Sequence, residues 1–205
     1  MPICEHAAGG GHLDVVKWCR ANGYPRCLTC LRAARLGQLK VLLWCVANGA
    51  PVTHPSIGCG CRGGHLETVM WCWEQGYQWG HGSMGFLAAI GGHLEVLKWL
   101  RANDWPLSSM TIVGAAQVAD LEIFKWYKAN NCRLMNIHPF AAERGNLEVV
   151  KWCVANVPYA SSFACDSAAK AGHLEVVQWM RAIGRPWGDT YCYLVTSGGH
   201  LEVLR

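Results

Sequence analysis

Apolar residues recur along the chain in a pattern that repeats about every 27 residues. An anchor leucine comes first, and in most copies apolar residues follow it two, three, five and six positions later. The anchors are Leu13, Leu39, Leu66, Leu94, Leu121, Leu147, Leu174 and Leu201. As a helix, this pattern covers more than half of the circumference, wider than the stripe of a helix on a single core. Stacked neighbours must cover such a helix on two sides, so the period predicts a repeat array.

Each copy also carries signals for the ends of two helices. A glycine stands two residues before the anchor in every copy except the one with Ala119, and an acid follows the anchor in all but one. Negative charge is favourable at a helix N-terminus. A residue that tolerates the left-handed conformation, such as Gly23 or Asn131, marks the other end. A pair of small residues, usually Ala-Ala, precedes the glycine and predicts a short first helix that approaches its neighbours closely.

One tryptophan per unit stands five residues after the anchor. We interpret these residues as a structural ladder that fills the space between neighbouring units: Trp18, Trp44, Trp71, Trp99, Trp126, Trp152 and Trp179. Trp73 and Trp105 fall outside this ladder, and exposed rings at these two positions would be candidates for a functional role.

The order of small pair, glycine, anchor and acid resembles the ankyrin repeat. The segments "AAIGGHLEVLKWLRAN" (88–103) and "AAKAGHLEVVQWMRAIG" (168–184) carry the resemblance best. It implies an all-α fold, an ankyrin-like helix-turn-helix repeat solenoid of about 7.5 repeats, and a role in protein–protein interaction. The period is shorter than the usual ankyrin period of about 33 residues, and the Thr-Pro-Leu-His box is missing. We therefore expect a reduced or absent β-finger. The short, Trp-containing form resembles arrays encoded by giant viruses, protists and algae.

We expect one ankyrin-like array over residues 1–205. Neither end shows a polar cap, and the last copy, "GHLEVLR", stops one residue before its tryptophan. The sequence thus predicts a fragment of a longer array, in which residues 190–205 fray first.

Composition narrows the class of partner. The formal net charge of +4, without a clustered basic face, argues against nucleic acid. No run of apolar residues is long enough for a membrane helix, and the N-terminal segment lacks the pattern of a secretory signal. We expect an intracellular, cytoplasmic monomer (host cytoplasm for a viral protein) with reduced thiols.

The cysteines and histidines mostly follow the repeat. Seven of the twelve cysteines occupy two repeat positions, which predicts small buried side chains. The alternative is a zinc site formed by Cys27, Cys30, Cys59 and Cys61, but we favour the core and expect no metal and no cofactor. The repeated histidines, His12, His65, His93, His173 and His200, are predicted to cap the turn before the second helix.

The residues that vary between units are the candidates for binding. They lie between the small pair and the turn glycine: Arg35, Arg62, Gln117, Glu143, Arg144 and Lys170. Drift at solvent-exposed positions is the alternative explanation. No singular carboxylate pair or nucleophile stands out, so we expect no enzyme. The sequence favours a non-catalytic scaffold that binds a protein along one elongated face. The alternatives are the targeting arm of a larger enzyme or ubiquitin-ligase adaptor, and a surplus array without a selected partner.

Overall fold

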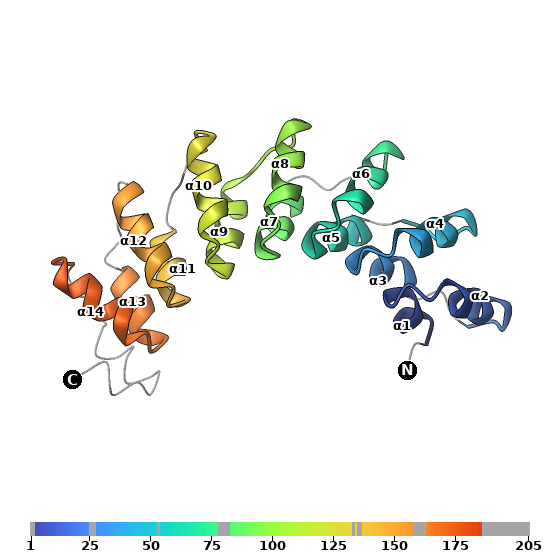
Figure 1. Ribbon diagram of the computed structural model, residues 1–205, viewed down its shortest axis with the longest axis horizontal. Coiled ribbons are helices and arrows are strands. Elements are labelled where there is room, and N and C mark those ends of the chain that lie inside the picture. The colour runs from blue at the N-terminus through green and yellow to red at the C-terminus, as the bar shows by residue number, and fades with distance from the viewer. Residues whose placement is uncertain are drawn as a thin grey trace. The chain divides into compact units, whose positions relative to one another are not determined.

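The computed structural model describes residues 3–24, 28–52, 54–77, 83–132, 134, 137–157 and 163–185 (Figure 1). These residues form fourteen helices in seven consecutive pairs, and no strand occurs among them. The prediction of an all-α helical repeat solenoid is confirmed. The predicted eighth unit, with Leu201 and the segment expected to fray, lies outside the described residues.

The helices alternate between a first and a second helix of each pair. The first helices are α1 (Ile3–Gly9), α3 (Thr29–Arg35), α5 (His54–Gly63), α7 (Ser83–Ile90), α9 (Ser109–Val118), α11 (His138–Glu143) and α13 (Phe163–Lys170). The second helices are α2 (Leu13–Ala21), α4 (Leu39–Ala47), α6 (Leu66–Glu74), α8 (Leu94–Ala102), α10 (Leu121–Ala129), α12 (Leu147–Asn156) and α14 (Leu174–Ala182). Every second helix begins at its anchor leucine.

The chain divides into two compact units, Met1–Thr111 and Ile112–Arg205. In the first unit, α1, α3, α5 and α7 pack side by side in chain order, while α2 lies against α4 and α6 against α8. In the second unit, α11 packs against α13, and α12 lies between α10 and α14. Within each compact unit, the helix contacts thus run mainly between the two helices of a pair and between equivalent helices of consecutive pairs, as expected of a repeat array.

The core of each pair comes from five repeat positions. The small pair of the first helix is buried in all described units. In the second helix, the residues three and six positions after the anchor are buried throughout, for example Leu97 and Leu100. The residue two positions after the anchor is buried in every described unit except the first, where Val15 is exposed. Small side chains on the first helix leave room for the larger buried side chains of the second helix.

The tryptophan ladder lies at the edge of this core. Trp44 and Trp71 pack against the buried cluster around Ala33 and Leu42 but remain partly exposed. Trp18 departs further from the prediction, because 55% of its surface is exposed. The other described rings of the ladder are also partly exposed. The small pairs and the buried residues two, three and six positions after the anchor form the core, and the indoles lie at its edge.

The predicted helix ends are present, with one addition. The residues expected to take the left-handed conformation have positive φ, including Gly23 (75°), Asp104 (58°) and Asn131 (52°). Just before this position, an asparagine donates its side-chain Nδ2–H to the backbone oxygen of the tryptophan in the preceding turn. These bonds, 2.8–2.9 Å long, are made by Asn22, Asn48, Asn103, Asn130 and Asn156. At Asn22, Asn48, Asn103 and Asn130 the same tryptophan oxygen also accepts the backbone N–H of the asparagine, so the side chain adds a second donor at the end of the helix.

The predicted ion pairs between the acid and the lysine three residues later are also present. The N–O distance is 2.7 Å for Lys98–Glu95, 2.8 Å for Lys125–Glu122 and 2.9 Å for Lys151–Glu148, and 3.8 Å for Lys17–Asp14. These exposed pairs stabilise their helices by only a few tenths of a kcal/mol each.

Candidate partner-binding surfaces

The variable residues lie at the C-terminal ends of the first helices. In the first compact unit these are Arg35 at the end of α3 and Arg62 near the end of α5, and both side chains are exposed. In the second unit Glu143, Arg144 and Lys170 are exposed, whereas Gln117 is half-buried. None of these charged side chains forms an ion pair with another described residue. Their charges are therefore available to a ligand.

A histidine of the next pair holds the backbone at three of these positions. The imidazole Nε2 of His65 lies 2.9 Å from the backbone oxygen of Arg35, and that of His93 lies 2.9 Å from the oxygen of Arg62. In the second unit, Nε2 of His173 lies 2.8 Å from the oxygen of Glu143. With the proton on Nε2, each histidine donates to a carbonyl that the end of the first helix leaves without a helical partner.

This contact corrects the predicted role of the histidines. His12, His65, His93 and His173 precede their second helices, but none caps its own helix through its side chain. Capping by the side chain does occur at the same repeat position, where shorter residues replace histidine. Asp120 accepts from Glu122 N–H at 2.9 Å and from Ile123 N–H at 3.3 Å, and Asn146 accepts from Val149 N–H at 3.2 Å. The short side chains of Asp120 and Asn146 reach their own helices. The Asn146 amide also donates its Nδ2–H to the backbone oxygen of Ala119, in the preceding pair, at 3.4 Å.

Glycines leave room for each histidine ring. The turn glycine Gly64 has φ of +76°, and a Cβ on it would collide with the ring of His93. Gly37 and Gly145 stand in the same relation to His65 and His173. A Cβ on Gly91 would collide with the carbonyl oxygen of Arg62. Turn glycine, histidine and carbonyl thus form one repeated contact between consecutive pairs.

The cysteines are mostly core residues. The described ones carry no disulfide, and most are buried, including Cys19, Cys72 and Cys153. Burial raises the pKa of Cys72 to about 11 and that of Cys153 to about 12. Thiols with such values stay protonated and are poor nucleophiles and poor metal ligands near neutral pH.

The zinc alternative finds no support in the described residues. Cys30 and Cys61 are buried and Cys59 is half-buried, while Cys27 lies outside the described residues. The thiol of Cys61 lies 3.8 Å from the sulfur of Met84, a core neighbour and not a ligand cluster. Among the described residues, no group of three or more His, Cys, Asp or Glu side chains is placed to hold a metal ion.

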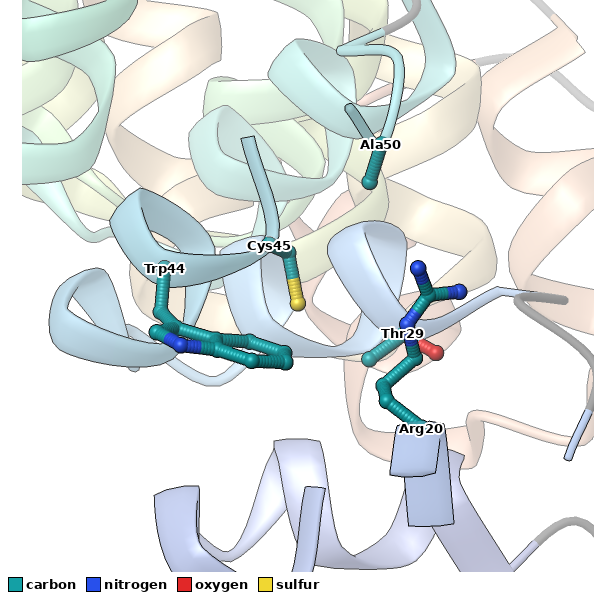
Figure 2. Close-up of a pocket in the computed structure, with 5 residues that line it drawn as sticks. All are labelled: Arg20, Thr29, Trp44, Cys45 and Ala50. Carbon is teal, nitrogen blue, oxygen red and sulfur yellow. The ribbon is translucent and has the colours of Figure 1, made fainter. Parts of the chain in front are cut away.

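A small pocket separates the second helices of the first two pairs. Figure 2 shows Arg20 extending from α2 toward Thr29, with the thiol of Cys45 pointing into the space beside Trp44. Its volume of about 10 Å³ holds at most about one water molecule. This pocket is therefore a packing feature and not a ligand site.

Trp73 and Trp105 form an aromatic cluster with a ladder residue. The Trp73 ring meets Trp99 edge-on at a centroid distance of 5.9 Å and Trp105 at 6.3 Å. Trp73 is partly exposed and Trp105 half-buried. Such T-shaped contacts contribute about 0.5–1.5 kcal/mol beyond area burial, so both residues contribute to packing between pairs.

Comparison with solved structures identifies the fold. No protein-family model and no curated protein matches the sequence. Among solved structures, the human ASB11 ankyrin repeat domain superposes with a TM-score of 0.62 and 21% identity, over 90% of this chain and 99% of that one. The chain has the ankyrin-repeat fold. The pentatricopeptide repeat protein PPR10 from maize also aligns, at 13% identity and a TM-score of 0.45, over 98% of this chain and 36% of that one.

The ankyrin-repeat fold accounts for the alternation of a shorter first helix, a glycine turn and a regular second helix. The described residues of the array are helices and turns without a strand, and most of the loops in which a finger would stand lie outside the described residues. None of its described helices has the length and apolar character needed to cross a membrane.

Proposed function

We propose that this ankyrin-repeat array is a non-catalytic protein–protein interaction scaffold. It holds its partner through the variable residues at the ends of the first helices. The observation that carries the proposal is the combination of exposed, unpaired side chains with a fixed backbone. At Arg35, Arg62 and Glu143 the main-chain oxygen is bound by a histidine of the next pair, while the side chain remains exposed.

Preorganisation is the physical mechanism. When a binding site is a flexible loop, the backbone of the loop becomes ordered on binding, and this ordering costs free energy. Here a histidine already holds the backbone oxygen of Arg35, Arg62 or Glu143, so only the side-chain rotamers have to be ordered on binding. The two compact units would select different partner surfaces. Arg35 and Arg62 favour an acidic surface, and Glu143, Arg144 and Lys170 favour one of mixed charge.

The test is affinity capture with charge-reversed variants. The chain is used as bait in a lysate of its own cell, with mass spectrometry as readout, beside an Arg35→Glu, Arg62→Glu variant and a Glu143→Lys, Lys170→Glu variant. The control variant, Lys17→Glu with Arg101→Glu, changes the same number of charges on the second helices. A partner lost with either test variant and retained by the control supports the proposal. Equal capture by all four proteins would overturn it.

Location and oligomeric state belong to the same proposal. We propose that the array acts as a monomer in the cytoplasm. Sedimentation equilibrium gives the mass directly, and a dimer at micromolar concentration would contradict the first part. Microscopy of the tagged chain in its own cell checks the second.

A further inference from the structure

The second helices α4 and α6 lack the charged outer surface of the other units. In four described units, the residue four positions after the anchor is a lysine that pairs with the acid one position after the anchor. In α4 and α6 the same position holds Leu43 and Met70, which remain 39% and 38% exposed. Two consecutive second helices therefore present apolar side chains to solvent where most units present lysine.

A groove lies between these two helices, within the compact unit Met1–Thr111. Its volume is about 450 Å³, and it is lined by Leu39 of α4 and by Leu66, Glu67, Met70, Trp71 and Glu74 of α6. This volume falls within the range of a few hundred Å³ that is typical of binding pockets. We call this site the α4–α6 groove. Its walls are apolar apart from two carboxylates.

The carboxylates of the groove have no cationic partner among the described residues. Glu67 occupies the acid position that pairs with lysine in the other units, but Met70 stands where its lysine would be. Neither Glu67 nor Glu74 forms an ion pair with a described residue. The two lie seven residues apart on α6, about 10 Å along the helix axis, and Met70 and Trp71 lie between them. The site therefore has an apolar centre with a negative charge at each end.

We propose that the α4–α6 groove binds a helical segment of a protein partner that carries an apolar side chain between two basic side chains. A helix lying along α6 would place basic residues seven positions apart beside Glu67 and Glu74. Its apolar side chain would enter between Leu66, Met70 and Trp71. The inference rests on the proposed protein-binding function and adds a second surface to it, on the second helices α4 and α6.

A designed peptide probes the groove directly. The probe is a fluorescein-labelled, alanine-based peptide of about 16 residues, long enough to form a helix in part. It carries two lysines seven positions apart and two leucines midway between them. The control peptide has glutamates in place of the lysines. We expect fluorescence anisotropy to show binding of the lysine peptide that weakens with added salt, and binding of the glutamate peptide at least about tenfold weaker.

The array supplies matched variants. Met70→Lys installs the lysine that four other units carry, so the fold is expected to tolerate it. The new lysine would pair with Glu67 and occupy the groove. Gln178→Lys makes the same change at the same repeat position of α14, away from the groove. We expect about a tenfold or greater loss of peptide binding for Met70→Lys and none for Gln178→Lys. Glu67→Gln with Glu74→Gln should remove most of the salt dependence.

The outcomes separate this inference from the proposed function. Three results would overturn the proposal that the groove binds a helix. The first is no binding of the lysine peptide, and the second is equal binding of the glutamate peptide. The third is equal peptide binding by the Met70→Lys and Gln178→Lys variants. If a partner captured from lysate still depends on Arg35 and Arg62, the proposed function stands without the groove. The peptide can bind as expected while the charge reversals at Arg35 and Arg62 leave partner capture unchanged. The groove proposal is then supported, and the binding surface lies on the second helices instead of the first.

Discussion

At the scale of single residues, one glycine and one histidine join a pair to the next at three places: Gly37 with His65, Gly64 with His93, and Gly145 with His173. The turn glycine has two physical reasons to lack a side chain: its φ is positive, and the imidazole of the following pair occupies the place of its Cβ. Gly64 and Gly76, which flank α6, allow the two reasons to be separated. Their φ values are similar, +76° and +68°, but a Cβ at Gly76 would meet nothing within 4 Å, whereas one at Gly64 would collide with His93.

We expect Gly76→Ala to lower the free energy of unfolding by about 1 kcal/mol, the cost of a left-handed residue with a Cβ. Gly64→Ala should cost about 2–3 kcal/mol, because overpacking against His93 adds to the same backbone strain. Urea titration followed by circular dichroism measures both. In the double variant Gly64→Ala, His93→Ala the collision is absent, so the two changes should be less than additive. Equal costs for the two glycine variants would show that the histidine contact is unimportant.

His138 is a second residue whose surroundings set its behaviour. It occupies the repeat position of Cys30 and Cys165 and is only 1% exposed. Burial lowers the pKa of its imidazole, an effect that the backbone of Cys153 partly offsets and the charge of Arg185 reinforces. The folded state therefore binds a proton less readily than the unfolded chain, and the stability contributed by neutral His138 is lost as the pH falls below about 6.5.

We therefore expect the wild-type chain to lose more stability than a His138→Cys variant between pH 7.5 and pH 5.5. The slope of this difference is at most about 1.4 kcal/mol per pH unit, the value for one proton. Urea titrations at the two pH values give the difference, in which any pH-independent cost of the smaller side chain cancels. His12→Cys at an exposed position serves as control. Parallel pH profiles for wild type and His138→Cys would contradict the assignment.

At the scale of helices, most of the structure follows from local sequence. The leucine period and the glycines predict where each second helix begins, because a left-handed residue ends the first helix two positions earlier. The local sequence pattern did not predict the contacts between residues of different pairs. His93 and Arg62 are far apart in sequence, and nothing local distinguishes a ring that caps its own turn from one that binds the neighbouring pair. The part-exposed tryptophans and the α4–α6 groove likewise depend on how pairs stack. The asparagine caps had a recurring signal, an asparagine four residues after five of the seven ladder tryptophans, which the prediction missed.

One turn has alanine where the other described turns have glycine, and a substitution there should stabilise the fold. Ala119 stands where every other described turn has glycine, and it adopts φ of +52°. We expect Ala119→Gly to raise the free energy of unfolding by about 0.5–1 kcal/mol, since relief of the left-handed strain outweighs the added freedom of the unfolded chain. The reverse change, Gly92→Ala at φ of +76°, should destabilise by a similar amount. Thermal and urea denaturation measure both, and a destabilising Ala119→Gly would contradict this account of the turn.

At the scale of the whole molecule, the effect of one pair on a distant pair depends on how the pairs pack, which the local sequence pattern does not show. Within each compact unit, the main helix contacts join the two helices of a pair or equivalent helices of consecutive pairs. Stability in such an array is close to a sum of unit and neighbour contributions, so a defect should act most strongly near its origin. Buried cysteines provide a reporter in each compact unit, Cys72 in the first and Cys153 in the second.

We expect Gly64→Ala to increase the alkylation rate of Cys72 by a larger factor than that of Cys153. Because burial raises the pKa of Cys72 to about 11 and that of Cys153 to about 12, the folded state holds little thiolate at pH 8. Labelling at either site then requires local opening, and its rate reports the free energy of that opening. Iodoacetamide labelling in low urea, followed by peptide mass spectrometry, measures both sites in one sample. An equal increase at both cysteines would mean that the two compact units open as one cooperative structure, and that neighbour contacts carry the effect of a single turn along the chain.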